Sequence, residues 1–178
     1  MTERRHLAYL LLGSNIDKER NIARAVELLA EAVPIKAVSS VFETVPAGNP
    51  NQESFLNAAV IVETDLSPQD LKRTVLAAIE DRLGRRRTAD KNAPRTIDLD
   101  VVLFDHEVGD VGGRPIPDPE LLRRAHVAVP LSEIAPDYVH PTTGQTLREI
   151  AASLAADGSV IAREHLDLRA YVETRAGG

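Results

Sequence analysis

Apolar and polar residues along the first hundred positions follow the patterns of strands and helices in turn. Residues 6–12, 35–44 and 55–63 are short and strongly apolar, as expected of buried strands. In the segments 17–33 and 67–83, apolar residues recur every three or four positions, as on one face of a helix. A fourth strand is predicted over 95–104, which gives the order strand, helix, strand, strand, helix, strand.

The ends of the two helices are marked by residues with known capping preferences. Asp17 can cap the first helix, and Pro34 ends it. Ser67 followed by Pro68 is typical of a helix start, and Gly84 of a helix end. This order of elements forms a four-stranded antiparallel sheet with two helices on one face. The sequence therefore predicts an α+β protein with a ferredoxin-like βαββαβ core.

The chain after residue 104 is less regular. We expect a surface loop, a helical turn, a short strand and a short helix, over residues 105–119, 121–124, 127–131 and 147–154, respectively. The remainder is polar and is expected to be peripheral or partly disordered. The predicted organisation is one catalytic domain, residues 1–155, with a polar C-terminal tail, residues 156–178.

The composition narrows the class of protein. With 178 residues, 43% of them hydrophobic and 27% charged, the chain is long enough for one well-packed domain. The absence of cysteine excludes disulfides and thiolate metal sites. The sequence shows neither a signal-peptide pattern nor an apolar segment of membrane-spanning length. We expect a cytoplasmic monomer with no membrane partner.

The charge is distributed unevenly along the chain. The formal net charge is −6, yet the segment from Asp81 to Arg95 contains six basic residues and two acidic ones. Binding to nucleic acid is disfavoured by the net charge and by an aromatic content of 3%, which is too low for base-stacking surfaces. The basic segment instead indicates a compact anionic ligand.

Two carboxylates open the fourth predicted strand. Side chains alternate between the faces of a strand, so Asp98 and Asp100 would point the same way, about 6.6 Å apart along the backbone. Two like charges on one face need a cation between them, and oxygen ligands suit Mg²⁺. The alternative is that the two aspartates are merely solvated or paired with arginine.

Arginines lie close to this pair in the sequence. Arg85, Arg86 and Arg87 follow the second predicted helix, and Arg95 lies three residues before Asp98. A guanidinium group can donate two hydrogen bonds to one phosphate. These arginines can also be solvated, or can interact with the carbonyl end of the helix. Carboxylates for a metal beside guanidinium groups for phosphate favour phosphoryl transfer.

Asn57 interrupts the third apolar strand near its start. A buried amide needs hydrogen-bond partners. It could bind the edge of a heterocycle, or it could form a hydrogen bond within the core, and the pattern favours neither. Thr44, at the end of the second strand, offers a similar but weaker signal.

Four segments together carry a family resemblance. In chain order they are Gly13-Ser14-Asn15, Phe55-Leu56-Asn57, Gly84-Arg85-Arg86-Arg87 and Ala93-Pro94-Arg95-Thr96-Ile97-Asp98-Leu99-Asp100. With them the chain resembles the 6-hydroxymethyl-7,8-dihydropterin pyrophosphokinases over about residues 7–155. These enzymes of folate biosynthesis transfer the pyrophosphoryl group of ATP to a pterin alcohol and release AMP. The resemblance implies ATP and a hydroxymethyl-dihydropterin as substrates.

The resemblance also implies roles for individual residues. Asp98 and Asp100 would bind two Mg²⁺ ions at the phosphates of ATP. Catalysis would involve these two aspartates together with Arg85 and Arg95. The triphosphate would be bound by Arg85, Arg87, Arg95 and Arg124. The pterin ring would be bound by Thr44 and Asn57 through hydrogen bonds, and by Phe55 and His126 through stacking.

Three positions depart from the family pattern. Asp118 stands where histidine is usual and, as an acid, would repel phosphate; His126 replaces an aromatic residue that is usually Phe; and Asn92 replaces a frequent tryptophan. The departures leave three interpretations open. The chain is the folate enzyme with an altered rim, a paralogue acting on a different pterin or alcohol, or a non-catalytic module that binds nucleotide or another small molecule.

Overall fold

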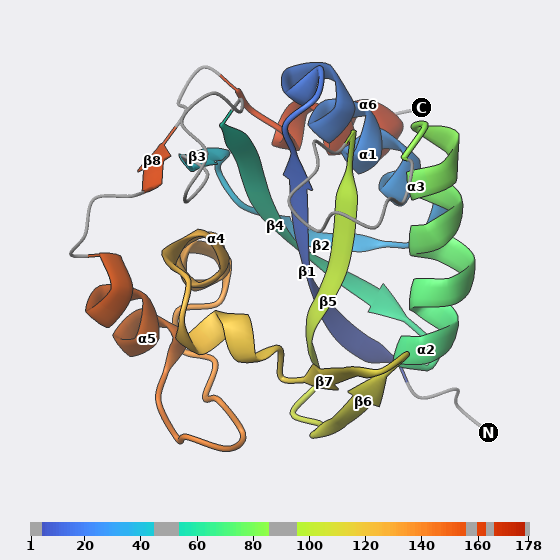
Figure 1. The fold of residues 1–178 in the computed structure, drawn as a ribbon. Coiled ribbons are helices and arrows are strands. Elements are labelled where there is room, and N and C mark those ends of the chain that lie inside the picture. Colours follow the sequence, from blue (N-terminus) through green and yellow to red (C-terminus); the bar gives the residue numbers. More distant parts are fainter. Residues whose placement is uncertain (1–4, 45–53, 86–95, 156–159, 163–165, 177–178) are drawn as a thin grey trace.

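The structure is a computed structural model that describes residues 5–44, 54–85, 96–155, 160–162 and 166–176. Its centre is an antiparallel sheet in which the strands follow the order β5-β1-β4-β3-β8, with β2 also paired to β4 (Figure 1). The strands are β1 (His6–Ser14), β2 (Ile35–Val38), β3 (Phe42–Thr44), β4 (Phe55–Thr64), β5 (Asp98–Phe104) and β8 (Val160–Ala162). The predicted core of four antiparallel strands is confirmed, although the second strand is divided into β2 and β3.

Helices cover both faces of this sheet (Figure 1). One face packs against α1 (Lys18–Ala32) and against a continuous helix that comprises α2 (Pro68–Asp70), the π-helical η1 (Leu71–Leu76) and α3 (Ala77–Arg82). The other face packs against α4 (Ala125–Ile134) and α5 (Leu147–Leu154). The last helix, α6 (Arg169–Ala176), packs beside α1.

The central strands are apolar throughout because both faces are buried. In β1, Leu10 and Leu12 belong to the hydrophobic core under α1, whereas Tyr9 and Leu11 belong to a second core under α4. A strand buried on both sides cannot show the apolar–polar alternation of a half-exposed strand. The sequence could therefore locate β1 but could not tell that a second helical layer covers it.

Two regions after β5 differ from the sequence-based expectation. Residues 105–119 were predicted as a surface loop, but they form a hairpin of β6 (Gly109–Val111) and β7 (Arg114–Ile116). The expected strand over 127–131 is wrong, because these residues lie within α4. A short apolar run is compatible with either a strand or a helix. Pro130 argued against a helix here, because proline removes one helical hydrogen bond. The predicted helix over 147–154 is confirmed as α5.

The segment after residue 155 contributes regular structure at one edge of the sheet and on the face that α1 covers. Strand β8 pairs with β3, and Leu168, just before α6, is 2% exposed within the core under α1. Within the described part of the chain, no helix is both long enough and apolar enough to cross a membrane.

Candidate active site

A row of directly paired residues crosses the sheet at one end of its central strands. Gly13 of β1 is paired with Asp98 of β5 on one side and with Asn57 of β4 on the other, and Asn57 is paired with Phe42 of β3. Directly paired residues in antiparallel strands point to the same face. The sheet thus places the metal-binding candidate Asp98 and the pterin-binding candidate Asn57 on one surface, two strand spacings or about 10 Å apart.

Gly13 keeps the surface open between these two side chains. A Cβ atom at this position would lie 3.2 Å from Asn57 Oδ1, which is tighter than ordinary van der Waals contact. Next along the same face, Leu11 is paired with Asp100 and contributes to the core under α4. The row therefore lies on the same face of the sheet, just beyond the apolar residues that α4 covers.

Asn57 makes a defined hydrogen bond at one end of the row. The side chain is 3% exposed, and its Nδ2 donates to Thr44 Oγ1 at 3.0 Å. Thr44 is paired with Phe55, whose ring also lies beside Gly13. The three candidates for pterin binding on β3 and β4 thus form one group. The sequence left open whether Asn57 binds a heterocycle or forms a hydrogen bond within the protein. The structure shows the hydrogen bond to Thr44, and the Asn57 side chain lies on the same face as the row.

Asp100 is surrounded by positive charge. Arg114 Nη1 donates to Asp100 Oδ1 at 2.9 Å, and Lys72 Nζ lies 3.5 Å from the same oxygen. Burial raises the pKa of the Asp100 carboxyl, and the negative charge of Asp98 raises it further, while Lys72 and Arg114 oppose the shift. Lys72 and Arg114 thus supply positive charge to Asp100, as in the alternative of pairing with arginine, and the carboxylate oxygens are also the ligands that Mg²⁺ prefers.

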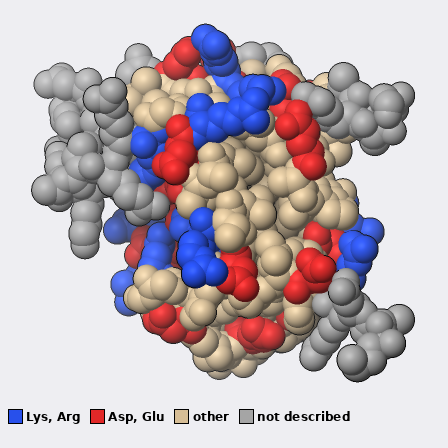
Figure 2. Space-filling view, turned by 90° about the vertical axis from the view of Figure 1, so that its right-hand side faces the viewer, with Lys and Arg blue, Asp and Glu red and all other residues tan. Residues whose placement is uncertain are grey.

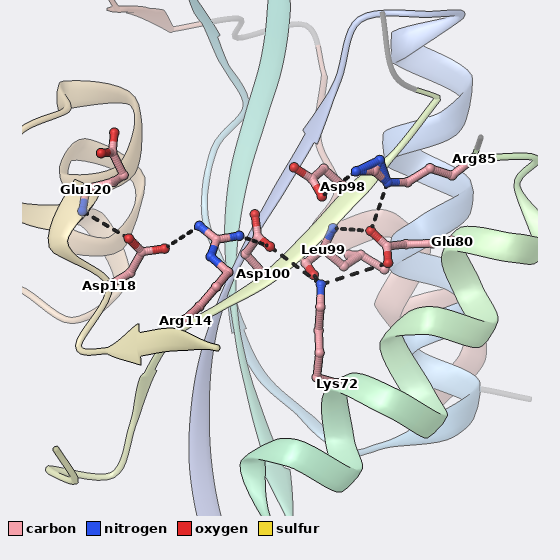
Figure 3. Close-up of polar contacts among 9 residues, drawn as sticks. All are labelled: Lys72, Glu80, Arg85, Asp98, Leu99, Asp100, Arg114, Asp118 and Glu120. Atoms are coloured by element: carbon pink, nitrogen blue, oxygen red, sulfur yellow. Dashed lines mark hydrogen bonds and ion pairs between the residues drawn. The ribbon is translucent and has the colours of Figure 1, made fainter. Parts of the chain in front are cut away.

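Asp98 is paired with an arginine from the end of the neighbouring helix. Arg85 Nη2 lies 3.7 Å from Asp98 Oδ1, and Arg85 Nε lies 3.4 Å from Glu80 Oε2 (Figure 3). The Arg85 side chain is only 11% exposed. Arg85 thus lies beside the metal-binding candidates, and Arg86 and Arg87 lie outside the described residues.

The backbone of Leu99, at the outer edge of β5, forms hydrogen bonds with side chains of the same helix. Its N–H donates to Glu80 Oε2 at 3.2 Å, and its carbonyl accepts a hydrogen bond from Lys72 Nζ. Glu80 is 2% exposed, and burial raises the pKa of its carboxyl, while Lys72 and the Leu99 N–H oppose the shift. These contacts fix the strand between Asp98 and Asp100, because Leu99 separates the two carboxylates.

The remaining candidates are placed less directly. Arg124 precedes α4 and pairs with Glu120, with 3.0 Å between Nε and Oε2. His126 lies in the first turn of α4, where burial lowers the pKa of its imidazole and the charge of Arg124 lowers it further. Arg87, Arg95 and the departure at Asn92 lie outside the described residues.

Several residues near the carboxylate pair were not predicted from the sequence. Lys72, Glu80 and Arg114 come from segments that are distant from Asp98 and Asp100 in the chain. Asp118 was expected to repel phosphate, but its carboxylate accepts a hydrogen bond from Arg114 Nη2 at 3.0 Å. Arg114 and Asp118 are four residues apart, and this spacing was the one sequence feature that could have suggested the pair. The spacing indicates pairing only once the local structure is known.

The charges around the helix α2–α3 are of both signs. Figure 2 shows this side of the molecule, and among the described residues basic side chains there lie beside acidic ones, with apolar surface between them. A continuous basic surface of the kind that binds a nucleic-acid backbone is not formed by the described residues in this view.

Comparison with known proteins identifies one family consistently. The model of the family 7,8-dihydro-6-hydroxymethylpterin-pyrophosphokinase (HPPK) matches residues 9–136. The chain is 43% identical over 154 residues to 2-amino-4-hydroxy-6-hydroxymethyldihydropteridine pyrophosphokinase of Methylorubrum extorquens, and the match covers 85% of this chain and 95% of that protein.

Two longer proteins contain a similar region. The folic acid synthesis protein FOL1 of Dictyostelium discoideum is 35% identical over 156 residues, which are 87% of this chain and 23% of that protein. The crystal structure of wild-type Plasmodium falciparum HPPK-DHPS with SDX-DHP matches with a TM-score of 0.66 at 14% identity, over 85% of this chain and 45% of that one. The chain thus spans about a quarter of the first protein and less than half of the second. At 14% identity, the likeness to the second protein shows the fold alone.

Proposed function

The chain belongs to the 7,8-dihydro-6-hydroxymethylpterin-pyrophosphokinase family, whose enzymes transfer pyrophosphate from ATP to hydroxymethyldihydropterin, and we propose that it uses the row from Asp98 to Asn57 for this reaction. The observation that carries the assignment is that Gly13 pairs with both residues, so that a phosphate-side and a pterin-side group face one surface. An acceptor alcohol bound over Gly13 would lie between them.

We propose that Asp98 and Asp100 hold two magnesium ions. The donor set fits, because both groups are carboxylates on one face of the sheet and Mg²⁺ prefers oxygen ligands. Magnesium bound here would neutralise phosphate charge and orient the nucleotide. The protein's own contribution is to fix the two carboxylates, through the hydrogen bonds of Glu80 and Lys72 to the intervening Leu99.

Arginines would bind the triphosphate. Arg85 is already held beside Asp98 and supplies a planar donor group on the phosphate side of the row. Arg95 is proposed to act with it in catalysis, and Arg87 and Arg124 to bind nucleotide. Phosphoryl transfer needs positioning and electrostatic stabilisation more than covalent chemistry, and these residues are suited to both.

The pterin would be bound on β3 and β4. Thr44 and Asn57 offer hydrogen-bonding groups at the end of the row, and Phe55 offers an aromatic face beside Gly13. His126 is proposed as the second stacking group. Its lowered pKa favours the neutral imidazole, which can stack on the ring without placing a charge against it. The monomeric state and the cytoplasmic location stay predictions.

The decisive experiment is incubation with MgATP and 6-hydroxymethyl-7,8-dihydropterin, with AMP and the pterin diphosphate measured. We expect Asp98→Ala and Asp100→Ala each to abolish AMP formation, by about 10³-fold or more, and to leave the circular dichroism spectrum unchanged. Asp137→Ala is the matched control, because this aspartate is 83% exposed and pairs only with Arg148 in the described structure.

The outcomes separate the remaining interpretations. Retained turnover in both aspartate variants would refute the metal assignment. Nucleotide binding by the wild-type protein without AMP formation would support a non-catalytic binding module. AMP formation with another alcohol in place of the pterin would support a paralogue, an alternative that the departures at Asp118 and His126 leave open.

A further inference from the structure

Arg114 bridges two carboxylates that belong to different parts of the site. Its Nη1 donates to Asp100 Oδ1 at 2.9 Å, and its Nη2 donates to Asp118 Oδ2 at 3.0 Å (Figure 3). The two terminal nitrogen atoms of one planar guanidinium group are thus divided between a candidate metal ligand and a residue where the family pattern usually has histidine. The charge of Asp118 is directed at Arg114 instead of at a phosphate.

The local structure holds Asp118 more firmly than Arg114. Arg114 directly follows the turn formed by Gly112 and Gly113, whose positive φ angles of 59° and 91° suit glycine. Asp118 is 7% exposed and precedes the short helix η2 (Pro119–Leu122), where its Oδ1 accepts a hydrogen bond from Glu120 N at 3.0 Å. Asp118 is therefore an immobile anchor, whereas Arg114 is a long side chain on a hairpin.

The two cations beside Asp100 differ in how they are held. Lys72 also donates to the Leu99 carbonyl and lies 3.9 Å from Glu80 Oε1, so it is part of the edge of β5. Within the described structure, the Arg114 guanidinium contacts side-chain carboxylates only, and its side chain is 55% exposed. Among the described residues, Arg114 therefore contacts side chains alone, whereas Lys72 also holds the backbone of β5.

From these contacts we propose that Arg114 is an exchangeable counter-ion of Asp100. The proposal rests on the proposed function, in which Asp100 is a magnesium ligand. In the protein without metal, Arg114 occupies the oxygen that magnesium would use. When MgATP binds, Arg114 leaves Asp100, stays attached to Asp118 and turns its freed Nη1 to a phosphate oxygen of the nucleotide. Arg114 is in this sense a nucleotide-binding residue, and Asp118 is the positioning residue that retains it.

The proposal makes opposite predictions for the metal alone and for the metal with nucleotide. Arg114 competes with Mg²⁺ for Asp100, so its removal should tighten the binding of Mg²⁺ alone. The same removal should weaken the binding of a magnesium complex of a nonhydrolysable ATP analogue, because a phosphate partner is lost. A residue with a purely structural role would weaken both.

The experiment is isothermal titration of the full-length protein with MgCl₂ alone and with the magnesium complex of the analogue. For Arg114→Ala we expect Mg²⁺ alone to bind roughly twofold to fivefold more tightly, the range that a partly exposed ion pair supports. The analogue should bind more weakly by a similar factor. Arg148→Ala is the matched control, because it removes an exposed arginine that pairs with Asp137 away from the site.

Two further variants separate pairing from the general effect of charge. Arg114→Lys keeps the charge but loses the fork that bridges two carboxylates, so Mg²⁺ alone should still bind more tightly than to the wild type. Asp118→Asn removes one of the two carboxylates that Arg114 contacts and leaves Asp100 as the other. Arg114 should then pair more strongly with Asp100, so Mg²⁺ alone should bind more weakly. Unchanged or weaker Mg²⁺ binding in Arg114→Ala, or wild-type Mg²⁺ binding in Arg114→Lys, would overturn the proposal.

Failure of the proposed function would look different. Asp100→Ala should abolish the binding of Mg²⁺ alone if this aspartate is a metal ligand. If Asp100→Ala binds Mg²⁺ as the wild type does, the metal assignment itself is refuted. If Asp100→Ala loses Mg²⁺ binding while Arg114→Ala gains none, the metal site stands and the exchange of Arg114 is refuted.

Discussion

His126 shows how burial sets the state of a single side chain at the candidate pterin site. The imidazole lies at the start of α4, where desolvation and the adjacent Arg124 lower its pKa below the ordinary value of about 6.5. The unfolded chain therefore binds this proton more readily than the folded protein does. The stability that neutral His126 contributes is complete above about pH 6.5 and is lost as the pH falls towards the lowered pKa.

The predicted consequence is a pH-dependent difference between the wild type and His126→Phe. Phenylalanine does not titrate, so the melting temperature of the wild type should fall relative to that of the variant between pH 7.5 and pH 5.5. One group can contribute at most about 1.4 kcal/mol per pH unit. Differential scanning fluorimetry across this range measures the difference.

An independent measurement checks the cause of this difference. Nuclear magnetic resonance can follow the titration of the His126 imidazole directly. A pKa at or above the ordinary value of histidine would contradict the explanation, even if the melting temperatures differed as expected. A lower Michaelis constant for the pterin in His126→Phe would add support for the stacking role, because the variant restores the aromatic side chain usual in the family.

At the scale of elements, the edge strand β5 depends on side chains from the helix α2–α3. An unpaired sheet edge exposes N–H and carbonyl groups, and here Glu80 and Lys72 pair with those of Leu99. Because Leu99 lies between Asp98 and Asp100, the same contacts that complete the edge also position the carboxylates. The edge of the sheet and the candidate metal site are thus one structural unit.

Removal of the Glu80 acceptor should destabilise this unit. We expect Glu80→Ala to lower the free energy of unfolding by about 1–3 kcal/mol, because the buried Leu99 N–H loses its partner. Glu80→Gln retains an acceptor oxygen and should cost clearly less. Urea denaturation of the protein without nucleotide measures both. An equal loss in the two variants would show that the charge of Glu80, and not its hydrogen bond to Leu99, stabilises the strand.

Sequence reasoning succeeded for several local features, although Asp17, at the start of α1, makes no side-chain capping hydrogen bond. The two-residue period of a strand is enough to place Asp98 and Asp100 on one face, and Ser67 caps its helix as predicted, with its Oγ accepting from Asp70 N at 3.1 Å. Contacts between distant segments were out of reach. Lys72 and Asp100 are 28 residues apart, and only the packing of the helix on the sheet edge brings them together.

At the scale of the whole molecule, the segment after residue 155 joins the two faces of the sheet. It leaves α5 on one face, adds β8 to β3 at the edge of the sheet, and ends with α6 beside α1 on the other face (Figure 1). The sequence predicted a polar tail because its apolar residues are few and widely spaced. Those few suffice, since Leu168 is buried in the core and Leu166 and Val172 pack against it.

This arrangement predicts that a substitution near the C-terminus affects the pterin side of the site. Leu168→Ala should lower the free energy of unfolding by about 2–4 kcal/mol, as expected for a leucine that is 2% exposed. Tyr171→Ala is the matched control, because this residue of α6 is 38% exposed and should cost within about 0.5 kcal/mol.

The position of β8 determines which part of the sheet should respond. Strand β8 pairs with β3, which carries Thr44, whereas β5 with the two aspartates lies at the opposite edge of the sheet. Hydrogen exchange in Leu168→Ala should therefore become faster in residues 42–44 before it changes in 98–104, and the Michaelis constant should rise for the pterin more than for ATP. Equal changes at both edges would mean that the segment stabilises the molecule as a whole and has no particular connection to β3.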